Sequence, residues 1–366
     1  MKFKTVIHWL LSMFILGFYT NDNENISNVI LELEKTQVKE NVIEDRESSN
    51  QEDKFNKIEE NINTEPIYSL DDIIHEVDKV AGENKDKISF YYYNFDTKDE
   101  YYFNENTYYV SASLKKVPLV MQVLDKVVAG ELTLDTKVAY DSETDYMNGT
   151  GILQVEEHIG ERTVGELIEL SILESDNIAF NMLNKVCGYT LVDYIREITG
   201  DSTIPEGEYS RLTAKQNFDI LYRLYTNPYK NKYYEEVIEL MKKTAFHDRF
   251  DKYIPHHKVA HKIGSYYRYY HDEGIIFARE KYILVIMSKD IGILSDDPQF
   301  TEFEEERVVI DWGEEACDII ARISKSIYDI IETGTVSSEK LIEYEPIKDE
   351  KEITNEAYGS LKNKEY

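Results

Sequence analysis

The stretch Ser113-Leu-Lys-Lys-Val-Pro-Leu-Val-Met121 is the part of the sequence from which the fold can be worked out. Ser113 and Lys116 are three residues apart, so on a helix they lie next to each other on one face. The apolar residues that follow predict a helix from about Ser113 to Val128. A serine hydroxyl becomes nucleophilic when a base removes its proton, and a partly desolvated lysine can be that base. Because this spacing is common by chance, its meaning depends on the rest of the chain.

Two later segments supply that context. Ser175-Asp-Asn177 lies between two predicted helices, and Lys262-Ile-Gly-Ser265 lies on a predicted strand. The ordered motifs S-x-x-K, S-D-N and K-T-G are the signature of class A β-lactamases and penicillin-binding proteins. The chain therefore resembles that family from about Ser69 to Gly334, with the first two motifs complete and Ile263 in place of threonine in the third.

The first two motifs indicate acyl transfer to a serine. We expect Ser113 at the start of its helix to be the nucleophile, because a helix N-terminus favours negative charge. We expect Lys116 to accept the proton of the hydroxyl, which requires the lysine to be neutral part of the time. In this interpretation Ser175 passes a proton to the leaving nitrogen and Asn177 binds the substrate amide. Asp176 fixes the loop, since aspartate is a good helix cap.

The third motif is expected to bind the substrate. The resemblance implies that Lys262 is the cationic neighbour of Lys116 and attracts a substrate carboxylate. Gly264 would let the strand approach the substrate closely. The resemblance also implies an oxyanion hole formed by the backbone N–H groups of Ser265 and Ser113.

Two departures from the family pattern bear on this expectation. Ile263 has no hydroxyl to offer a substrate carboxylate, and Ser265 is the residue that could replace it. The family's Glu-x-x-x-Asn loop, whose glutamate activates the deacylating water, has no full counterpart. Glu206 and Glu208 occupy the corresponding stretch, but no asparagine follows at the right spacing. We favour a solvated loop for these two glutamates, keep them as candidate deacylation bases, and predict slow deacylation.

The predicted elements place strands at both ends of the domain and helices in the middle. This order predicts an α+β fold: an antiparallel sheet flanked by helices, with an inserted all-helical subdomain. Capping boxes predict helices that begin after Ser69 and Thr163. Further helices are expected at 177–188, 191–198, 214–225, 233–246 and 304–331, the last with Trp312 on its apolar face, and strands at 88–95, 101–103, 258–265, 273–278 and 282–288.

The termini are predicted to lie outside the folded domain. Lys2 and Lys4 precede an uncharged stretch from Thr5 to Tyr19, which suits a signal peptide or an uncleaved membrane anchor over residues 1–20. Residues 21–67 form an expected acidic, disordered linker, with 13 acidic and 5 basic residues between 21 and 65. The serine hydrolase domain is predicted over 68–334, followed by a disordered polar tail over 335–366. We expect an extracytoplasmic protein, and any retained N-terminal segment would contact the membrane.

Composition excludes some partners. A net charge of −30 argues against nucleic acid, because phosphate contacts need clusters of basic residues. Cys187 and Cys317 are too few for a disulfide framework or a metal site, and each is expected to be a small buried hydrophobe, although one bridge between them stays possible. The tyrosine-rich run 91–93 predicts a strand with one buried and one wet face.

Four histidines at 247, 256, 257 and 261 make a zinc site conceivable, but we favour a His-rich loop and predict no metal. No cofactor is implied, because all of the expected chemistry uses side chains. We expect a monomer that acts on a β-lactam or a peptidoglycan peptide. A cell-wall D-Ala peptidase and a non-catalytic sensor of the cell wall or of β-lactams are the alternatives.

Overall fold

The computed structural model describes residues 67–204, 211–295 and 308–336. All described residues belong to one compact unit, which begins at Pro66. Several sequence predictions therefore lie outside the described residues: the N-terminal segment 1–20, the linker except Ile67, Glu206, Glu208, and the tail beyond Val336.

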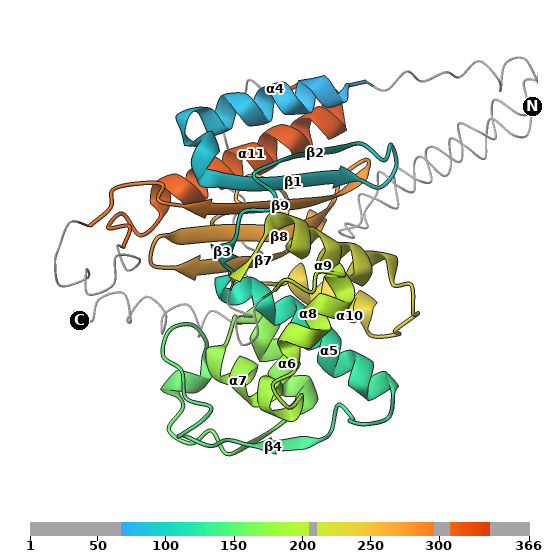
Figure 1. The fold of residues 1–366 in the computed structure, drawn as a ribbon, viewed down its shortest axis with the longest axis vertical. Coiled ribbons are helices and arrows are strands. Elements are labelled where there is room, and N and C mark those ends of the chain that lie inside the picture. The colour runs from blue at the N-terminus through green and yellow to red at the C-terminus, as the bar shows by residue number, and fades with distance from the viewer. Residues whose placement is uncertain (1–66, 205–210, 296–307, 337–366) are drawn as a thin grey trace, which may run out of the picture. The chain divides into compact units, whose positions relative to one another are not determined.

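The centre of the domain is a five-stranded sheet with the strand order β2-β1-β9-β8-β7 (Figure 1). Every neighbouring pair is antiparallel, which confirms the predicted sheet. The strand that carries the third motif, β7, lies at one edge. The strands are β1 (Ile88–Asn94), β2 (Glu100–Phe103), β7 (Val259–Tyr266), β8 (Tyr269–Phe277) and β9 (Lys281–Lys289).

The predicted wet face of the tyrosine-rich strand is wrong, because both faces of β1 are covered. Successive side chains on a strand point to opposite faces. Tyr91 accordingly packs into one hydrophobic cluster and Tyr92 into the other, and both are buried. At β1 the sheet lies between two layers of helices, so neither face of this strand is open to water.

One face of the sheet is covered by α4 (Leu70–Ala81) and α11 (Glu314–Thr333), which lie side by side (Figure 1). The predicted capping box at Ser69 is present, with its side chain accepting from the Asp72 backbone N–H. The last helix begins ten residues later than predicted. Trp312 precedes that helix, has a φ of 55° and is 81% exposed, so its predicted place on the apolar face is wrong.

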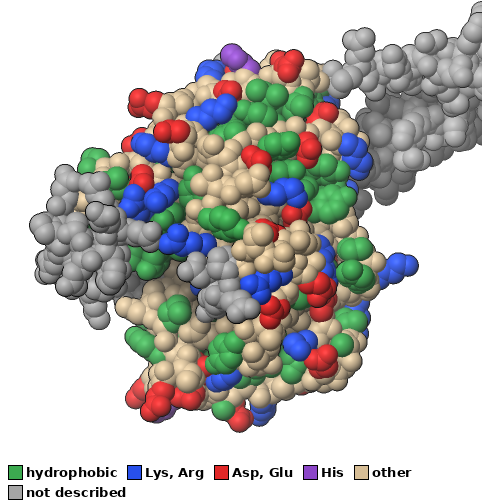
Figure 2. All heavy atoms as spheres, in the orientation of Figure 1, with side chains coloured by type: hydrophobic (Ala, Val, Ile, Leu, Met, Phe, Trp, Pro, Cys, Tyr) green, Lys and Arg blue, Asp and Glu red, His purple; other side chains and the backbone are tan. Residues whose placement is uncertain are grey.

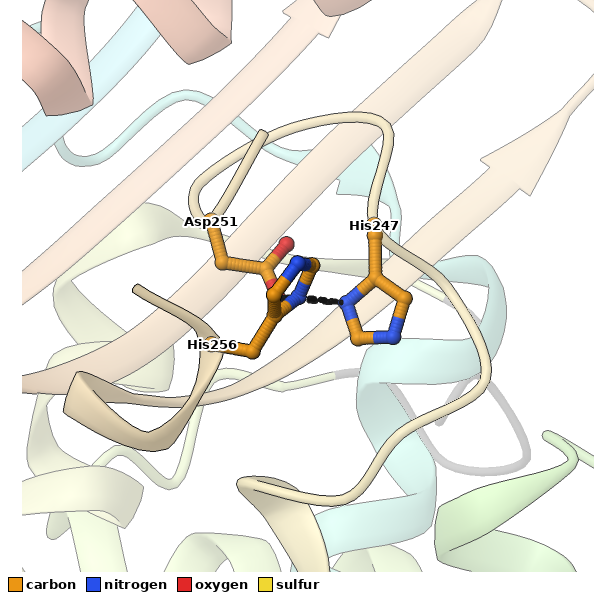
Figure 3. A group of neighbouring side chains, drawn as sticks. All are labelled: His247, Asp251 and His256. Atoms are coloured by element: carbon orange, nitrogen blue, oxygen red, sulfur yellow. Dashed lines mark hydrogen bonds and ion pairs between the residues drawn. The ribbon is translucent and has the colours of Figure 1, made fainter. Parts of the chain in front are cut away.

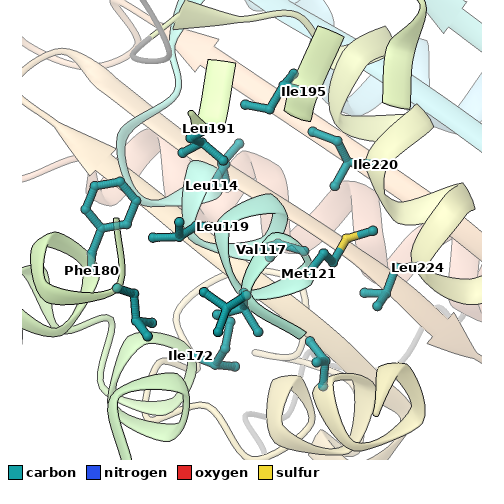
Figure 4. Packing of buried hydrophobic residues seen from close by; sticks show 14 of the residues in the cluster. Leu114, Val117, Leu119, Met121, Ile172, Phe180, Leu191, Ile195, Ile220 and Leu224 are labelled. Carbon is teal, nitrogen blue, oxygen red and sulfur yellow. The ribbon is translucent and has the colours of Figure 1, made fainter. Parts of the chain in front are cut away.

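Helices between the two groups of strands form the rest of the domain, as predicted. α5 runs through their core, where its apolar side chains pack against those of α6 to α9 (Figure 4). The predicted capping box of Thr163 and Glu166 opens α6. These helices are α5 (Lys116–Val128), α6 (Val164–Leu173), α7 (Asn177–Val186), α8 (Leu191–Thr199), α9 (Ala214–Thr226) and α10 (Tyr234–Met241).

Shorter elements connect these helices and strands. The 3₁₀ helices are η1 (Gly82–Lys87), η2 (Ala112–Lys115), η3 (Leu153–Val155) and η4 (His256–Lys258). The strand β3 (Tyr109–Val110) pairs with β6 (Arg211–Leu212), and β4 (Lys137–Ala139) pairs with β5 (Glu161–Thr163). The prediction that α10 extends to Phe246 is wrong, because the helix ends at Met241 and an irregular segment leads to β7.

Three further observations concern the sequence predictions. Cys187 and Cys317 are both free and buried, so the possible bridge between them is not formed. Within the described ranges, no helix combines the length and the apolar character needed to cross a membrane. Acidic and basic side chains are interspersed over the face of the molecule seen in Figure 2.

Candidate active site

Ser113 lies at the junction of a 3₁₀ helix and an α-helix. It is the second residue of η2, and α5 begins three residues later at Lys116. The preceding residue, Ala112, has a φ of 48°, a left-handed conformation that is costly for a residue with a side chain. This geometry brings Ser113 Oγ to 2.9 Å from Lys116 Nζ.

Lys116 is almost fully buried, with 1% of its surface exposed. Its ammonium nitrogen also contacts the backbone oxygen of Ser175 at 2.5 Å, the hydroxyl of Ser175 at 3.1 Å and Oδ1 of Asn177 at 2.8 Å. Burial, together with the nearby positive charges of Lys262 and Lys115, lowers the pKa of Lys116 well below its ordinary value. Both burial and like charge disfavour the ammonium form. This lysine is therefore suited to present a neutral amine, whose lone pair can accept a proton, beside the hydroxyl of Ser113.

Ser175 and Asp176 lie in the turn between α6 and α7, and Asn177 is the first residue of α7. Asp176 caps α7 by accepting the Ala179 backbone N–H at 2.9 Å, as predicted, and its second oxygen accepts the Leu153 N–H at 2.8 Å. Ser175 has a φ of 51°. The strained serine is thereby turned toward Lys116 while its neighbour anchors the loop.

Lys262 reaches the same serine from the sheet. Its Nζ lies 2.9 Å from Ser175 Oγ and 3.1 Å from the backbone oxygen of Ile263. Burial lowers the pKa of Lys262 to about 7, and the Arg249 guanidinium adds to this effect against the opposing charge of Asp272. Two buried lysines with lowered pKa values therefore share the hydroxyl of Ser175.

Packing explains why position 264 is a glycine, which the sequence did not reveal. A Cβ at this position would lie 2.9 Å from the backbone oxygen of Ser111 and 3.2 Å from Leu114 Cγ. Any larger residue would push β7 away from η2, the element that carries Ser113. The absence of a side chain thus keeps the two sides of the site together.

Arg249 was missed by the sequence analysis. Its guanidinium is buried and donates to the hydroxyl of Ser265 at 2.6 Å, to the Gly264 carbonyl at 3.1 Å and to the His271 carbonyl at 2.6 Å. The outer end of β7 therefore carries a positive charge directly behind Ser265, which is itself exposed. Ile263 is buried and supplies no polar atom from its side chain.

Glu273 was also missed. It is the register partner of Lys262 on the neighbouring strand β8, so both side chains lie on the same face of the sheet. Glu273 is fully buried, and neither carboxyl oxygen has a hydrogen-bond partner within the described part of the chain. Burial raises the pKa of Glu273 well above its ordinary value, an effect to which Asp272 adds and which Lys262 opposes.

The candidate deacylation bases cannot be placed, since Glu206 and Glu208 lie outside the described residues. Among the described residues, no carboxylate lies within hydrogen-bonding distance of Ser113 Oγ or Lys116 Nζ. A polar hollow of about 350 Å³ lies beside Tyr108 and Gln216, and none of the predicted site residues lines it.

The histidines are arranged differently from a simple His-rich loop. His247, His256 and His261 gather around the buried carboxylate of Asp251, whereas His257 is exposed. His247, His256 and His257 lie in the irregular segment before β7, as the predicted His-rich loop implies, but two of them contact one buried carboxylate, which the sequence prediction did not include. The spacing could not reveal this arrangement, because Asp251 gives no motif signal and the segment that contains it is irregular.

This sheet, flanked by helices and joined to a helical part, is a class A β-lactamase-like fold. The chain belongs to the Beta-lactamase enzyme family, whose model matches residues 72–331. No match was found among curated proteins.

Solved structures agree on the fold. TLA-3 extended-spectrum β-lactamase is 21% identical with a TM-score of 0.60, and the alignment covers 72% of this chain and 100% of that one. PBP-A is 17% identical with a TM-score of 0.58, covering 70% of this chain and 94% of that one. A β-lactamase from Sphaerobacter thermophilus is 18% identical with a TM-score of 0.58, covering 72% and 98%.

Proposed function

We propose that the protein is an exported serine hydrolase that forms an acyl-enzyme on Ser113 by attacking the carbonyl of a β-lactam or a related amide. The observation that carries this proposal is the 2.9 Å contact between Ser113 Oγ and the buried Lys116 Nζ. A hydroxyl held against a desolvated amine is the arrangement that nucleophilic catalysis by serine requires. The uncharged N-terminal stretch Thr5–Tyr19 supports export.

In the proposed reaction Lys116 is the general base. The neutral amine takes the proton of Ser113 Oγ as the oxygen bonds to the carbonyl carbon, and the carbonyl oxygen becomes an oxyanion. The backbone N–H groups of Ser113 and Ser265 stabilise that oxyanion, an interaction of the kind worth about 10²–10³ in rate per donor.

Collapse of this intermediate needs a proton on the leaving nitrogen. The hydroxyl of Ser175 supplies it as the C–N bond breaks. The proton held by Lys116 then restores the Ser175 hydroxyl across their 3.1 Å contact, so the proton taken from the nucleophile balances the one given to the amine. Asn177 holds Lys116 from the other side and binds the substrate amide.

Substrate carboxylate recognition is proposed for the exposed end of β7. Lys262 and Arg249 supply positive charge there, and Arg249 donates to the hydroxyl of Ser265. A hydroxyl whose lone pair is occupied by a guanidinium is free to point its own hydrogen at a carboxylate. Ser265 would thus perform the task for which Ile263 has no group.

Deacylation is proposed to be slow. The sequence lacks the Glu-x-x-x-Asn pattern, and the carboxylates of Glu206 and Glu208 are the alternatives for activating water. A mutant of the structural relative PBP-A is known as an acyl-enzyme complex with penicillin G. A ligand of the same class is therefore the natural first probe for this protein.

The decisive experiment is intact-mass spectrometry after mixing the protein with benzylpenicillin. We expect a mass increase of one penicillin in the wild type that persists for many minutes, and none in Ser113→Ala. Ser142→Ala, which removes an exposed hydroxyl elsewhere, is the matched control. An adduct that survives in Ser113→Ala would overturn the role of this serine, and rapid release of hydrolysed penicillin would overturn slow deacylation.

Two other functions would use the same residues. A D-Ala peptidase would release D-alanine from peptidoglycan stem peptides, which an amino-acid assay detects. A non-catalytic sensor of the cell wall or of β-lactams would bind its ligand with nearly equal affinity in the wild type and in Ser113→Ala. The buried, mutually contacting Lys116, Ser175 and Lys262 favour the catalytic proposals, since binding alone does not require a desolvated base.

A further inference from the structure

A second cluster of titratable side chains lies in the irregular segment between α10 and β7. Three of its members are His247, Asp251 and His256 (Figure 3). Nδ1 of His247 lies 2.5 Å from Asp251 Oδ2, and Nδ1 of His256 lies 2.7 Å from the same oxygen. The two Nδ1 atoms also face each other within hydrogen-bonding distance. Three potential metal ligands thus converge on one point.

The position of Asp251 is determined by its neighbours. The backbone N–H of Phe250 donates to Asp272 Oδ2 at 3.0 Å, and the carbonyl of Phe250 accepts from Ser324 Oγ at 3.0 Å. These two bonds attach the chain just before Asp251 to the sheet and to α11. Asp251 is consequently 1% exposed and aimed at the two histidines.

The convergence of these three atoms needs either a shared proton or a metal ion. Each Nδ1 has a lone pair when its hydrogen is on the other ring nitrogen, and the carboxylate oxygen is an acceptor only. Without a shared proton or a metal ion, the three lone pairs repel one another. Two imidazoles and one carboxylate are a donor set that Zn²⁺ accepts, with a fourth position for water in sites that are not closed.

We propose that His247, Asp251 and His256 bind one divalent transition-metal ion, with Zn²⁺ the preferred metal. Tetrahedral bonds of about 2.0–2.1 Å require ligand atoms roughly 3.3 Å apart. The present separations of 2.5 and 2.7 Å reach that value by small side-chain rotations. The side chains of His247 and His256 are 22% and 15% exposed, which leaves an entry path and room for a water ligand.

An outer shell for such a site is also present. Asp251 Oδ1 and His261 Nε2 are 3.4 Å apart, both residues are fully buried, and neither atom has a hydrogen-bond partner in the described part of the chain. His261 is held from behind by Asp272, whose oxygens lie 2.9 and 3.0 Å from its Nδ1. A ligating carboxylate is usually held by a hydrogen bond of its own. His261 Nε2 is the group placed to donate that bond to Asp251 Oδ1.

Metal binding would have a structural consequence. The ligands bracket residues 247–256, and this segment contains Arg249, whose guanidinium contacts Ser265. Closing the segment with a metal stabilises the folded state by an amount that grows with free metal concentration. The proposal is independent of acyl transfer, since its readouts are metal content and stability.

The test uses the full chain, stripped with a chelator and then titrated with Zn²⁺ alone by calorimetry. We expect one Zn²⁺ per chain and a higher melting temperature with the metal. His247→Gln and His256→Gln should each lose more than the roughly 10- to 100-fold in affinity that is typical of losing an outer-shell partner. His257→Gln is the matched control, because His257 is adjacent and exposed, and its affinity should equal that of the wild type.

The proposal fails if the wild type takes up no stoichiometric Zn²⁺, or if both glutamine variants bind it as tightly as the wild type does. A measurement that needs no variant is the visible spectrum of the Co²⁺-loaded wild type. Four-coordinate Co²⁺ with nitrogen and oxygen ligands gives strong d–d bands that Zn²⁺ removes by displacement. Weak bands typical of hydrated Co²⁺ would contradict the proposed site.

Discussion

Neighbouring residues on the two faces of β7 show opposite titration behaviour. Lys262 points toward Ser175 and the helical part, where burial lowers its pKa to about 7. His261 points to the other face, where the carboxylates of Asp272 and Asp251 outweigh burial and raise its pKa to about 10. Because consecutive strand residues face opposite layers, one strand holds an amine that loses its proton easily on one side and a stable imidazolium on the other.

The comparison teaches what each face is built for. On the lysine face, cations gather around hydroxyls, so that losing a proton is easy. On the histidine face, a cation is held between anions, so that keeping a proton is easy. Perturbed pKa values occur both at functional sites and in structural ion pairs, so the charged partners of each group have to be considered together with its pKa.

The largest expected effect is on the lysine face. Lys116→Met should slow acylation of Ser113 by benzylpenicillin by about 10²–10⁴-fold, the usual value of a general base. Stopped-flow or quenched mass spectrometry gives the rate. Lys79→Met is the matched control, since Lys79 lies on α4 with its side chain 63% exposed. Equal slowing in both variants would argue against Lys116 as the base.

The next effect is on the histidine face. His261→Gln leaves the buried carboxylates of Asp251 and Asp272 without their shared cation, and breaking a buried pair in this way costs about 3–5 kcal/mol. Urea unfolding of the metal-free protein measures the loss. His257→Gln should leave the midpoint unchanged, because that side chain is exposed. A loss below about 1 kcal/mol in His261→Gln would mean that the carboxylates do not depend on the imidazolium.

A smaller effect is the pH dependence of the free energy of unfolding, to which His261 and Lys262 contribute with opposite sign. The pKa of His261 is raised from 6.5 to about 10 on folding, so its stabilisation is complete below pH 6.5 and is lost as the pH rises to about 10. The pKa of Lys262 falls from 10.5 to about 7, so its burial cost is complete below pH 7 and disappears toward pH 10.5. The two slopes oppose each other in the wild type.

Replacing either Lys262 or His261 should reveal the pH dependence that the other residue gives to the free energy of unfolding. Relative to the wild type, the free energy of unfolding of Lys262→Met should fall with rising pH between about 7 and 10, and that of His261→Gln should rise. Each slope is at most about 1.4 kcal/mol per pH unit. Chemical unfolding at several pH values gives both slopes. Slopes of the same sign in the two variants would contradict the opposite titration behaviour of Lys262 and His261.

The smallest expected effect is on substrate binding at Ser265, at the exposed end of β7. Ser265→Ala removes the hydroxyl that accepts from Arg249 but keeps the backbone N–H of the oxyanion hole. We expect kcat/KM for a carboxylate-bearing β-lactam to fall roughly 2- to 10-fold, the value of one hydrogen bond, mainly through KM. A fall confined to kcat would instead place the hydroxyl in the chemical step.

Much of the fold could be predicted because its signals are local. The capping boxes at Ser69 and Thr163 and the apolar periodicity of α5, α7 and α9 depend on residues a few positions apart. The failures also have local causes. Trp312 continues the apolar period of α11 but precedes its start, and α10 stops at Met241 although the helical pattern continues.

Some residues of the site could likewise be predicted from local signals and others could not. Ser113, Lys116, Ser175 and Lys262 could be named from their motifs, and the structure brings all four together through contacts of 2.9 to 3.1 Å. Their catalytic roles stay predictions. Arg249 and Glu273 could not be named, because the contacts of a buried guanidinium or carboxyl come from strands that are distant in sequence.

The sequence by itself determined the order of the elements, the identity of the motif residues and the antiparallel α+β arrangement, because hydrophobic period and capping chemistry act over single turns and strands. Only the tertiary structure decided which charges face one another. It set Lys262 against hydroxyls and His261 against carboxylates, and it gathered His247 and His256 on Asp251. The physical reason is that burial and charge pairing act through space, so the same side chain gains or loses a proton according to the layer that it enters.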